Sequence, residues 1–152
     1  MLSFDPEKIA LPAGHYINGQ HQAGEGSALL VNRPSDGLPA GQLYEADAQK
    51  VDEAVSIADR SVRESGWASC PPRQRGAVLR RWADLIASDT QLAQLESLGS
   101  TRPISDVINH EIPFTAEAIR FYAECADKYS GDVLPTRDAS LGMLVPEPYG
   151  VI

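Results

Sequence analysis

The sequence predicts an α/β fold that is mostly helical, has a few short strands and is incomplete. Between residues 47 and 131, apolar residues recur at helical spacing in several segments. Short strand-like runs bounded by turn residues precede them, and an apolar, extended segment, Leu141–Ile152, ends the chain. Because a terminal strand without a partner leaves an unpaired edge, we expect the chain to be the front portion of a larger protein.

The composition of the chain argues against some classes of binding partner and indicates its cellular compartment. The net charge of −8 argues against nucleic acid and anionic membrane, since both bind basic surfaces. Two cysteines, Cys70 and Cys125, are too few for a disulfide framework. Acidic Asp5 and Glu7 stand where a signal peptide would be basic, and no segment approaches the length of a membrane helix. The sequence therefore predicts a cytoplasmic protein with reduced thiols.

The strands are expected in the first third of the chain, after an N-terminal arm. Residues 1–15 show little pattern and contain two prolines, so we expect a flexible arm there. Short strands are predicted at Tyr16–His21 (turning at Asn18-Gly19), at Ala28–Asn32 and at Gln42–Ala46. The cluster Arg33–Gly37 combines proline, aspartate and glycine, which each favour a turn.

Two long amphipathic helices are expected next. Asp47 is a good N-cap for the first, whose stripe of valines and alanines ends before Gly66. We expect Trp67 to fold back onto that helix. The Pro71-Pro72 pair opens the second helix, since proline is tolerated in a first turn. Its apolar positions are Val78, Leu79, Trp82, Ala83, Leu85 and Ile86.

Further helices fill the chain up to Gly131. Either Ser88 or Asp89 is expected to cap a third helix, which Gly99 would close. A short helical piece is expected from Pro103 to His110. Pro113 is then expected to start a longer helix that ends at Gly131.

No local motif for catalysis, cofactor or metal binding is present. The sequence contains no G-x-G-x-x-G, no P-loop and no H-E-x-x-H. Its three histidines lack metal-ligand spacing. Neither Cys70 nor Cys125 has an adjacent base, so both are interpreted as buried or incidental thiols. The residues alone therefore indicate no catalytic, cofactor-binding or metal-binding residue.

Several short segments nevertheless follow one another in a characteristic order. They are Tyr16–Gly19, Asn32–Gly37, Val51–Val55 with Ala58, Trp67, Arg73–Leu79 with Ala83–Ile86, Leu95–Leu98 with Arg102–Pro103, Ala118–Ala123 with Asp127 and Gly131, and Pro146–Ile152. In order and spacing they resemble the N-terminal portion of the NAD(P)-dependent aldehyde dehydrogenase superfamily. Within it they are most similar to bacterial enzymes acting on γ-glutamylamino-butanal and related amino-aldehydes.

The resemblance implies an oxidoreductase that converts a small-molecule aldehyde to a carboxylic acid with NAD or NADP. In the family a cysteine thiolate attacks the aldehyde, and the resulting thiohemiacetal is oxidised and then hydrolysed. The nucleophile, oxyanion hole, general base and cofactor-binding residues of the family all lie beyond the position matching Ile152. Cys70 and Cys125 do not match the nucleophile. The resemblance therefore implies that this chain alone is inactive and binds no cofactor.

The resemblance also implies a role for each part of the chain. Residues 16–131 match the N-terminal layer of the cofactor-binding domain, and 132–152 match the start of an oligomerisation hairpin, which implies a homo-oligomer. The helix from Pro113 matches one at the mouth of the substrate tunnel, so His110, Glu111 and Phe114 are the candidate substrate-tunnel residues. The alternative for Phe114 is simple packing in the core.

The chain departs from the family pattern at one place, and other functions stay open. Gly99–Pro103 stands where the family usually has Asp-x-Gly-Lys-Pro, so a carboxylate and a glycine are absent. A non-enzymatic interaction or self-association module is one alternative, because strands with open edges and uncovered apolar stripes favour association. A gene remnant without function is the other.

Overall fold

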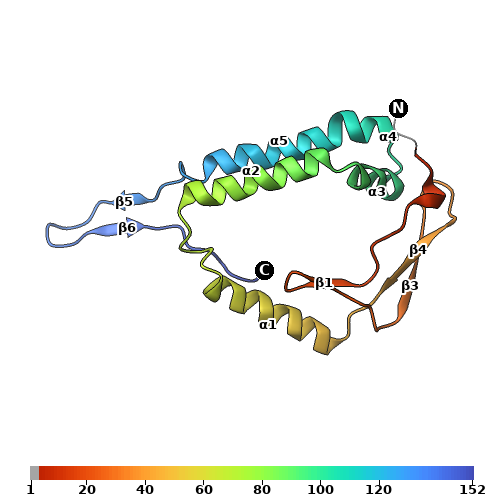
Figure 1. Cartoon of the computed structure of the whole chain (residues 1–152). Helices are drawn as coiled ribbons and strands as arrows, with labels where there is room; N and C mark the ends of the chain where they lie inside the picture. The colour runs from red at the N-terminus through yellow and green to blue at the C-terminus, as the bar shows by residue number, and fades with distance from the viewer. Residues whose placement is uncertain (1–3) are drawn as a thin grey trace.

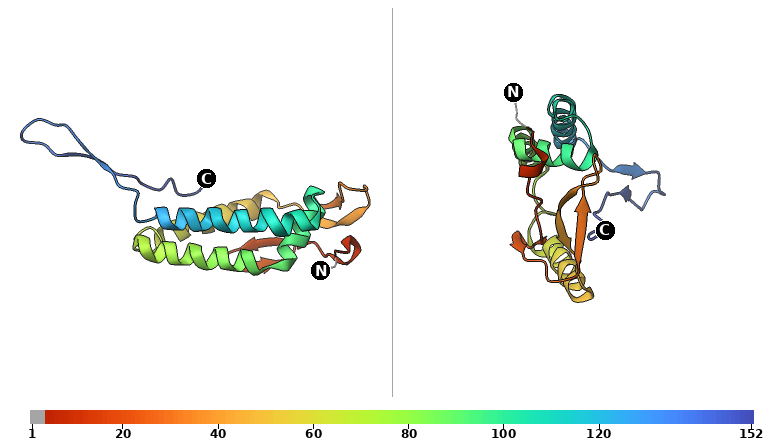
Figure 2. Two further views of the ribbon diagram at one scale, coloured as in Figure 1. Left: turned by 90° about the horizontal axis from the view of Figure 1, so that it is seen from above. Right: turned by 90° about the vertical axis from the view of Figure 1, so that its right-hand side faces the viewer.

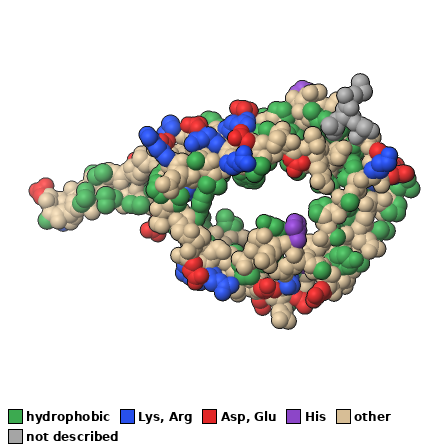
Figure 3. Space-filling model, in the orientation of Figure 1, with side chains coloured by type: hydrophobic (Ala, Val, Ile, Leu, Met, Phe, Trp, Pro, Cys, Tyr) green, Lys and Arg blue, Asp and Glu red, His purple; other side chains and the backbone are tan. Residues whose placement is uncertain are grey.

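The chain forms a ring of helices and strands from which one hairpin projects (Figure 1). The computed structural model describes residues 4–152, so residues 1–3 of the expected arm lie outside the description. Helices α2 (Pro72–Ser88) and α5 (Ile112–Cys125) form one side of the ring, and α1 (Ala48–Glu64) forms the opposite side. The strands between residues 28 and 44 close one end, and the hairpin of residues 15–22 lies beside α1. A space-filling view shows an opening through the middle (Figure 3).

The first hairpin confirms the predicted turn. Strands β1 (His15–Ile17) and β2 (Gln20–Gln22) pair antiparallel around Asn18 and Gly19. Both turn residues have positive φ, 55° and 74°, which is the conformation that a tight hairpin turn requires. Upstream, the described part of the arm contains one short 3-10 turn, η1 (Pro6–Lys8).

The second hairpin holds a buried arginine. Strand β3 (Ala28–Asn32) lies where it was predicted and pairs antiparallel with β4 (Pro39–Tyr44). The third strand thus begins earlier than the predicted Gln42, because pairing with β3 extends it back to Pro39. In the turn between them, the buried Arg33 guanidinium donates to Asp36 at 3.0 Å and pairs with its second oxygen at 2.9 Å. This two-point contact fixes the predicted Arg33–Gly37 turn.

Helix α1 begins as predicted but buries none of its residues. Asp47 caps it by accepting a hydrogen bond of 2.7 Å from the Lys50 amide. At its other end Trp67 and Val62 line one cavity, which places the indole beside the last turn of the helix. Along its length, however, Val51 and Val55 stay about half exposed.

Helices α2 and α5 pack closely, and small residues allow it. Gly76 and Ala83 of α2 and Ala116 and Ala123 of α5 are all buried. Because none of these side chains is larger than a methyl group, the two helix backbones can approach each other.

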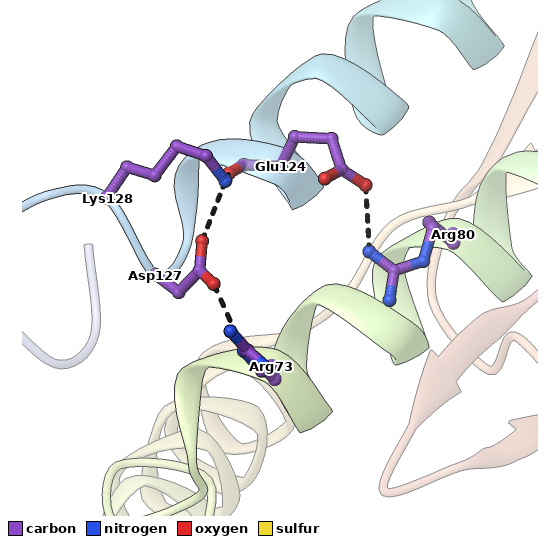
Figure 4. A network of polar contacts seen from close by, with 5 residues as sticks. All are labelled: Arg73, Arg80, Glu124, Asp127 and Lys128. Carbon is purple, nitrogen blue, oxygen red and sulfur yellow. Dashed lines mark hydrogen bonds and ion pairs between the residues drawn. The ribbon is translucent and has the colours of Figure 1, made fainter.

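Ion pairs at one end of this helix pair tie α2 to α5 (Figure 4). Arg80 reaches Glu124 at 2.9 Å, and Arg73 reaches Asp127 at 3.3 Å. Lys128 also bonds Asp127, at 2.8 Å. The Lys128 contact, together with the Arg73 contact, holds the pKa of Asp127 below its ordinary value.

The start of helix α3 (Thr90–Ser100) shows which of the two expected residues, Ser88 or Asp89, is its N-cap. The Asp89 carboxylate accepts from the Gln91 and Leu92 amides at 2.8 and 3.1 Å, whereas the Ser88 hydroxyl donates to the Leu85 carbonyl. The expectation that Gly99 closes the helix is wrong, since Gly99 lies inside it. The end comes at Thr101, which adopts the left-handed conformation with φ 64°.

The next two expected helices are one continuous helical stretch. Helix α4 (Ile104–Asp106) runs into η2 (Val107–Glu111), a π-helical turn, and this runs into α5. Pro113 therefore does not start a separate helix. The wider turn before it, in which the Ile112 amide bonds the Val107 carbonyl, carries the chain past a residue that has no amide hydrogen. The helix ends at Cys125 rather than at Gly131.

The C-terminal region is a hairpin followed by irregular chain. Strand β6 (Gly142–Leu144) pairs antiparallel with β5 (Asp132–Leu134), so the expected terminal strand has a partner. The expectation of one strand over Leu141–Ile152 is wrong beyond Leu144, where Pro146 and Pro148 lack the amide that a ladder needs. Figure 2 shows the hairpin projecting away from the helices.

Candidate functional site

The three candidate substrate-tunnel residues lie on the continuous helix from α4 to α5. His110 and Glu111 belong to the π-helical turn, and Phe114 lies in the first turn of α5. The His110 ring nitrogen Nδ1 lies 2.8 Å from the Asp106 carboxylate, which fixes the orientation of the ring. Glu111 forms an ion pair with Arg102, which precedes α4. Both polar residues are thus held by partners within the same region.

Phe114 is a surface residue. Its side chain is 74% exposed, so it does not pack in a core formed by the described residues. Phe121, seven positions later in the same helix, is also exposed, and a separation of seven residues places both rings on one side of α5. Sequence reasoning missed Phe121, although this spacing signals a shared face. The arrangement gives α5 an exposed aromatic side next to His110.

A separate cavity lies on the other side of this helix, between α3 and α5. Its volume is about 240 Å³, and its walls are largely apolar. The lining residues are Ala87, Asp89, Thr90, Ala93, Ile108, Ile112, Pro113, Ala116, Glu117 and Arg120. None of the three candidate tunnel residues is among them. The structure therefore separates His110, Glu111 and Phe114 from this cavity.

The positive charge of Arg120, which lines this cavity, is neutralised by two carboxylates. Arg120 donates to Asp84 at 2.8 Å and to Glu117 at 2.9 Å. The Asp84 bond, followed by the Glu117 bond, raises the pKa of Arg120 above its ordinary value. With two carboxylates on one guanidinium, the cavity has no free positive charge for an anionic ligand.

Cys70 and Cys125 are free and half-buried. The Cys70 sulfur lies 3.6 Å from the Gln74 amide oxygen and 3.8 Å from the Pro71 carbonyl oxygen, neither of which is a base. Within residues 4–152, no group of three His, Cys, Asp or Glu side chains could hold a metal ion.

The described residues do not fit a nicotinamide dinucleotide. Their strands form three two-stranded antiparallel sheets, β1-β2, β3-β4 and β5-β6. A dinucleotide site of the doubly wound type needs neighbouring parallel strands, with the phosphates at the N-terminus of a crossover helix. We therefore assign no step of a redox reaction to these residues.

Comparison with known proteins identifies the family. The model of the aldehyde dehydrogenase family matches residues 21–152, nearly the whole chain. The chain belongs to the aldehyde dehydrogenase family. It is 39% identical over 147 residues to the NADP/NAD-dependent aldehyde dehydrogenase PuuC of Escherichia coli (strain K12), covering 95% of this chain. It is 34% identical over 146 residues to the aminoacetaldehyde dehydrogenase of Pseudomonas aeruginosa, again covering 95% of the chain.

Solved structures of the family share the fold. The gamma-glutamyl-gamma-aminobutyraldehyde dehydrogenase of Burkholderia cenocepacia J2315 is 29% identical, with a TM-score of 0.85 over 95% of this chain. PnpE, solved in complex with nicotinamide adenine dinucleotide, is 33% identical, with a TM-score of 0.77 over 86% of this chain. The chain spans 30% of the first of these structures and 27% of the second.

The fold is therefore an incomplete, N-terminal part of the aldehyde dehydrogenase fold. The chain likewise spans only 30% of PuuC and 29% of the aminoacetaldehyde dehydrogenase. Across residues 4–152, no helix is both long and apolar enough to cross a membrane.

Proposed function

We propose that this chain is the N-terminal segment of an enzyme that oxidises an aldehyde to a carboxylic acid with NAD or NADP. The reaction proceeds through a cysteine thiohemiacetal, and the nucleophile belongs to the part of the family fold outside this chain. The observation that carries the proposal is the 39% identity to a NADP/NAD-dependent aldehyde dehydrogenase over 95% of the chain. On this proposal the chain by itself turns over no aldehyde and binds no cofactor.

Amino-aldehydes are the proposed substrates, and His110, Glu111 and Phe114 are proposed to lie at the mouth of the substrate tunnel. The names of two relatives, an aminoacetaldehyde dehydrogenase and a gamma-glutamyl-gamma-aminobutyraldehyde dehydrogenase, support this substrate class. The exposure of the Phe114 ring supports the tunnel role, because the ring can offer apolar surface to the carbon chain of a substrate.

A chimera tests this function. Residues 1–152 would replace the matching portion of Escherichia coli PuuC in one covalent chain, and aldehyde-dependent formation of NADH or NADPH would be measured. We expect activity from the chimera and none from the isolated 152-residue chain. A chimera that folds and binds NAD but oxidises no aldehyde would contradict the proposal, and so would turnover by the isolated chain.

Self-association is a second candidate function, and the projecting hairpin favours it. Val133 of β5 and Met143 of β6 are 72% and 61% exposed, and the hairpin extends beyond the ring (Figure 1). Apolar side chains on short strands with free edges favour pairing with another copy. Light scattering of the purified chain tests this: a homo-oligomer that Val133→Asp dissociates would support it, and a monomer at high concentration would contradict it.

A further inference from the structure

Helix α2 carries an apolar stripe that nothing in the described chain covers. Val78, Trp82 and Leu85 are 53%, 53% and 52% exposed. Steps of four and three residues place them on one side of the helix. Gly76 and Ala83, which pack against α5, lie on the opposite side by the same periodicity. We call Val78, Trp82 and Leu85 the α2 stripe.

Helix α1, on the opposite side of the ring, also carries exposed apolar side chains. Val51 and Val55 are 49% and 48% exposed, and the helix buries no residue at all. Helical stability in proteins comes mainly from packing of an amphipathic face rather than from intrinsic propensity. An amphipathic helix of 17 residues with no buried position therefore lacks its main source of stability.

Both helices border the central opening (Figure 1), and hydrophobic side chains gather around its rim (Figure 3). The ring of a second copy is too large to enter this opening, and its projecting hairpin, with two strands of three residues each, is too short to cover both 17-residue helices. A polypeptide with a different shape is required. The relatives supply one, since the same ring makes up only 30% of a solved family member that it matches with a TM-score of 0.85.

We propose that the α2 stripe and the exposed face of α1 bind the remaining portion of an aldehyde dehydrogenase polypeptide, even when it is a separate chain. The inference rests on the proposed function and names the partner of this surface. The binding energy comes from apolar area removed from water, and Trp82 is the aromatic anchor at the centre of the stripe.

A two-chain experiment tests the inference. Residues 1–152 and the rest of Escherichia coli PuuC would be co-expressed as separate chains, purified through a tag on the first, and assayed for aldehyde-dependent NADH formation. Co-purification with activity is the expected result. An active covalent chimera with no two-chain complex would overturn this inference and leave the proposed function intact. If the chimera is inactive as well, both fall.

Variants of the complex test the surface itself. Trp82→Ala should weaken the affinity between the two chains about 30-fold, as for loss of a buried aromatic anchor. Leu38→Ala is the matched control, because Leu38 is 51% exposed but lies in the turn between β3 and β4. Circular dichroism would verify that both variants keep their helices. Equal affinities of the folded variants, or a homodimer that Trp82→Ala abolishes, would overturn the inference.

Discussion

Gly76 of α2 lies directly against the carbonyl oxygen of Ala123 in α5. A Cβ atom added to Gly76 would be 2.8 Å from that oxygen, closer than real Cβ contacts come. The two helices can therefore keep their present distance only because position 76 has no side chain. This contact sets the spacing of the best-packed pair of elements in the described chain.

Gly76→Ala should destabilise the chain even though alanine is the better helix former. Pushing the helices apart costs about 1–3 kcal/mol, as for overpacked cores. Gly99→Ala is the control, because a Cβ at Gly99 in α3 meets no atom within 4 Å. There we expect a gain of about 0.5–1 kcal/mol from helix propensity. Urea unfolding followed by circular dichroism measures both, and equal effects would contradict the close contact.

The cap of α3 gives a test with unequal outcomes at two adjacent residues. Asp89→Ala should cost about 1 kcal/mol, because the Gln91 and Leu92 amides lose their acceptor. Ser88→Ala should change the free energy of unfolding by much less, since its hydroxyl only donates to a carbonyl one turn back. Thermal unfolding of the two variants distinguishes them, and a larger loss for Ser88→Ala would refute the assignment of Asp89.

The Asp36 carboxylate should make stability fall in acid. The Leu38 amide, with help from Arg33, holds the pKa of Asp36 below its ordinary value of 3.8. A group with a lowered pKa stabilises the fold above its unfolded-state value, and this stabilisation disappears as pH falls through the lower, folded-state pKa. Asp36→Asn should therefore lower stability at neutral pH, and the difference from the unchanged chain should shrink below pH 3.8. Unfolding titrations from neutral to acid pH measure it; a constant difference would contradict this role.

Phe114 should affect the aldehyde and leave the cofactor unaffected. In the active chimera with PuuC, Phe114→Ala should raise the KM for an amino-aldehyde roughly tenfold, because apolar contact with the substrate is lost. The KM for NAD serves as the internal control and should stay unchanged. Steady-state kinetics measures both constants, and a parallel rise in the two would assign Phe114 to the packing of the enzyme.

Local signals in the sequence were reliable where one or two residues decide the structure. Asn18-Gly19 forms the predicted turn because both residues tolerate positive φ. Asp47 caps α1 because its short carboxylate reaches the Lys50 amide. These features depend on neighbours in the chain, which the sequence displays directly.

Features that depend on distant neighbours were not predictable in the same way. Pro113 signals a helix start, but a π-helical turn lets the preceding helix continue through it. Residue patterning did not identify strand β5, because its three residues, Asp132–Leu134, are exposed and carry no alternation; only the resemblance implied a hairpin over 132–152. The stripe on α2 was identified, but periodicity cannot say which polypeptide covers it. The candidate site, His110, Glu111 and Phe114, came from the family resemblance, because no pattern of neighbouring residues marks these three positions.

The cavity shared by Trp67, Pro148 and Gly150 has a practical consequence. The residues that follow β6 return to the end of α1, so Pro148 and Gly150 lie near the indole of Trp67. A quencher attached at Ile152 should dim the fluorescence of this tryptophan while the C-terminal residues stay beside it. Recovery of the emission would then report that this segment has detached from the end of α1.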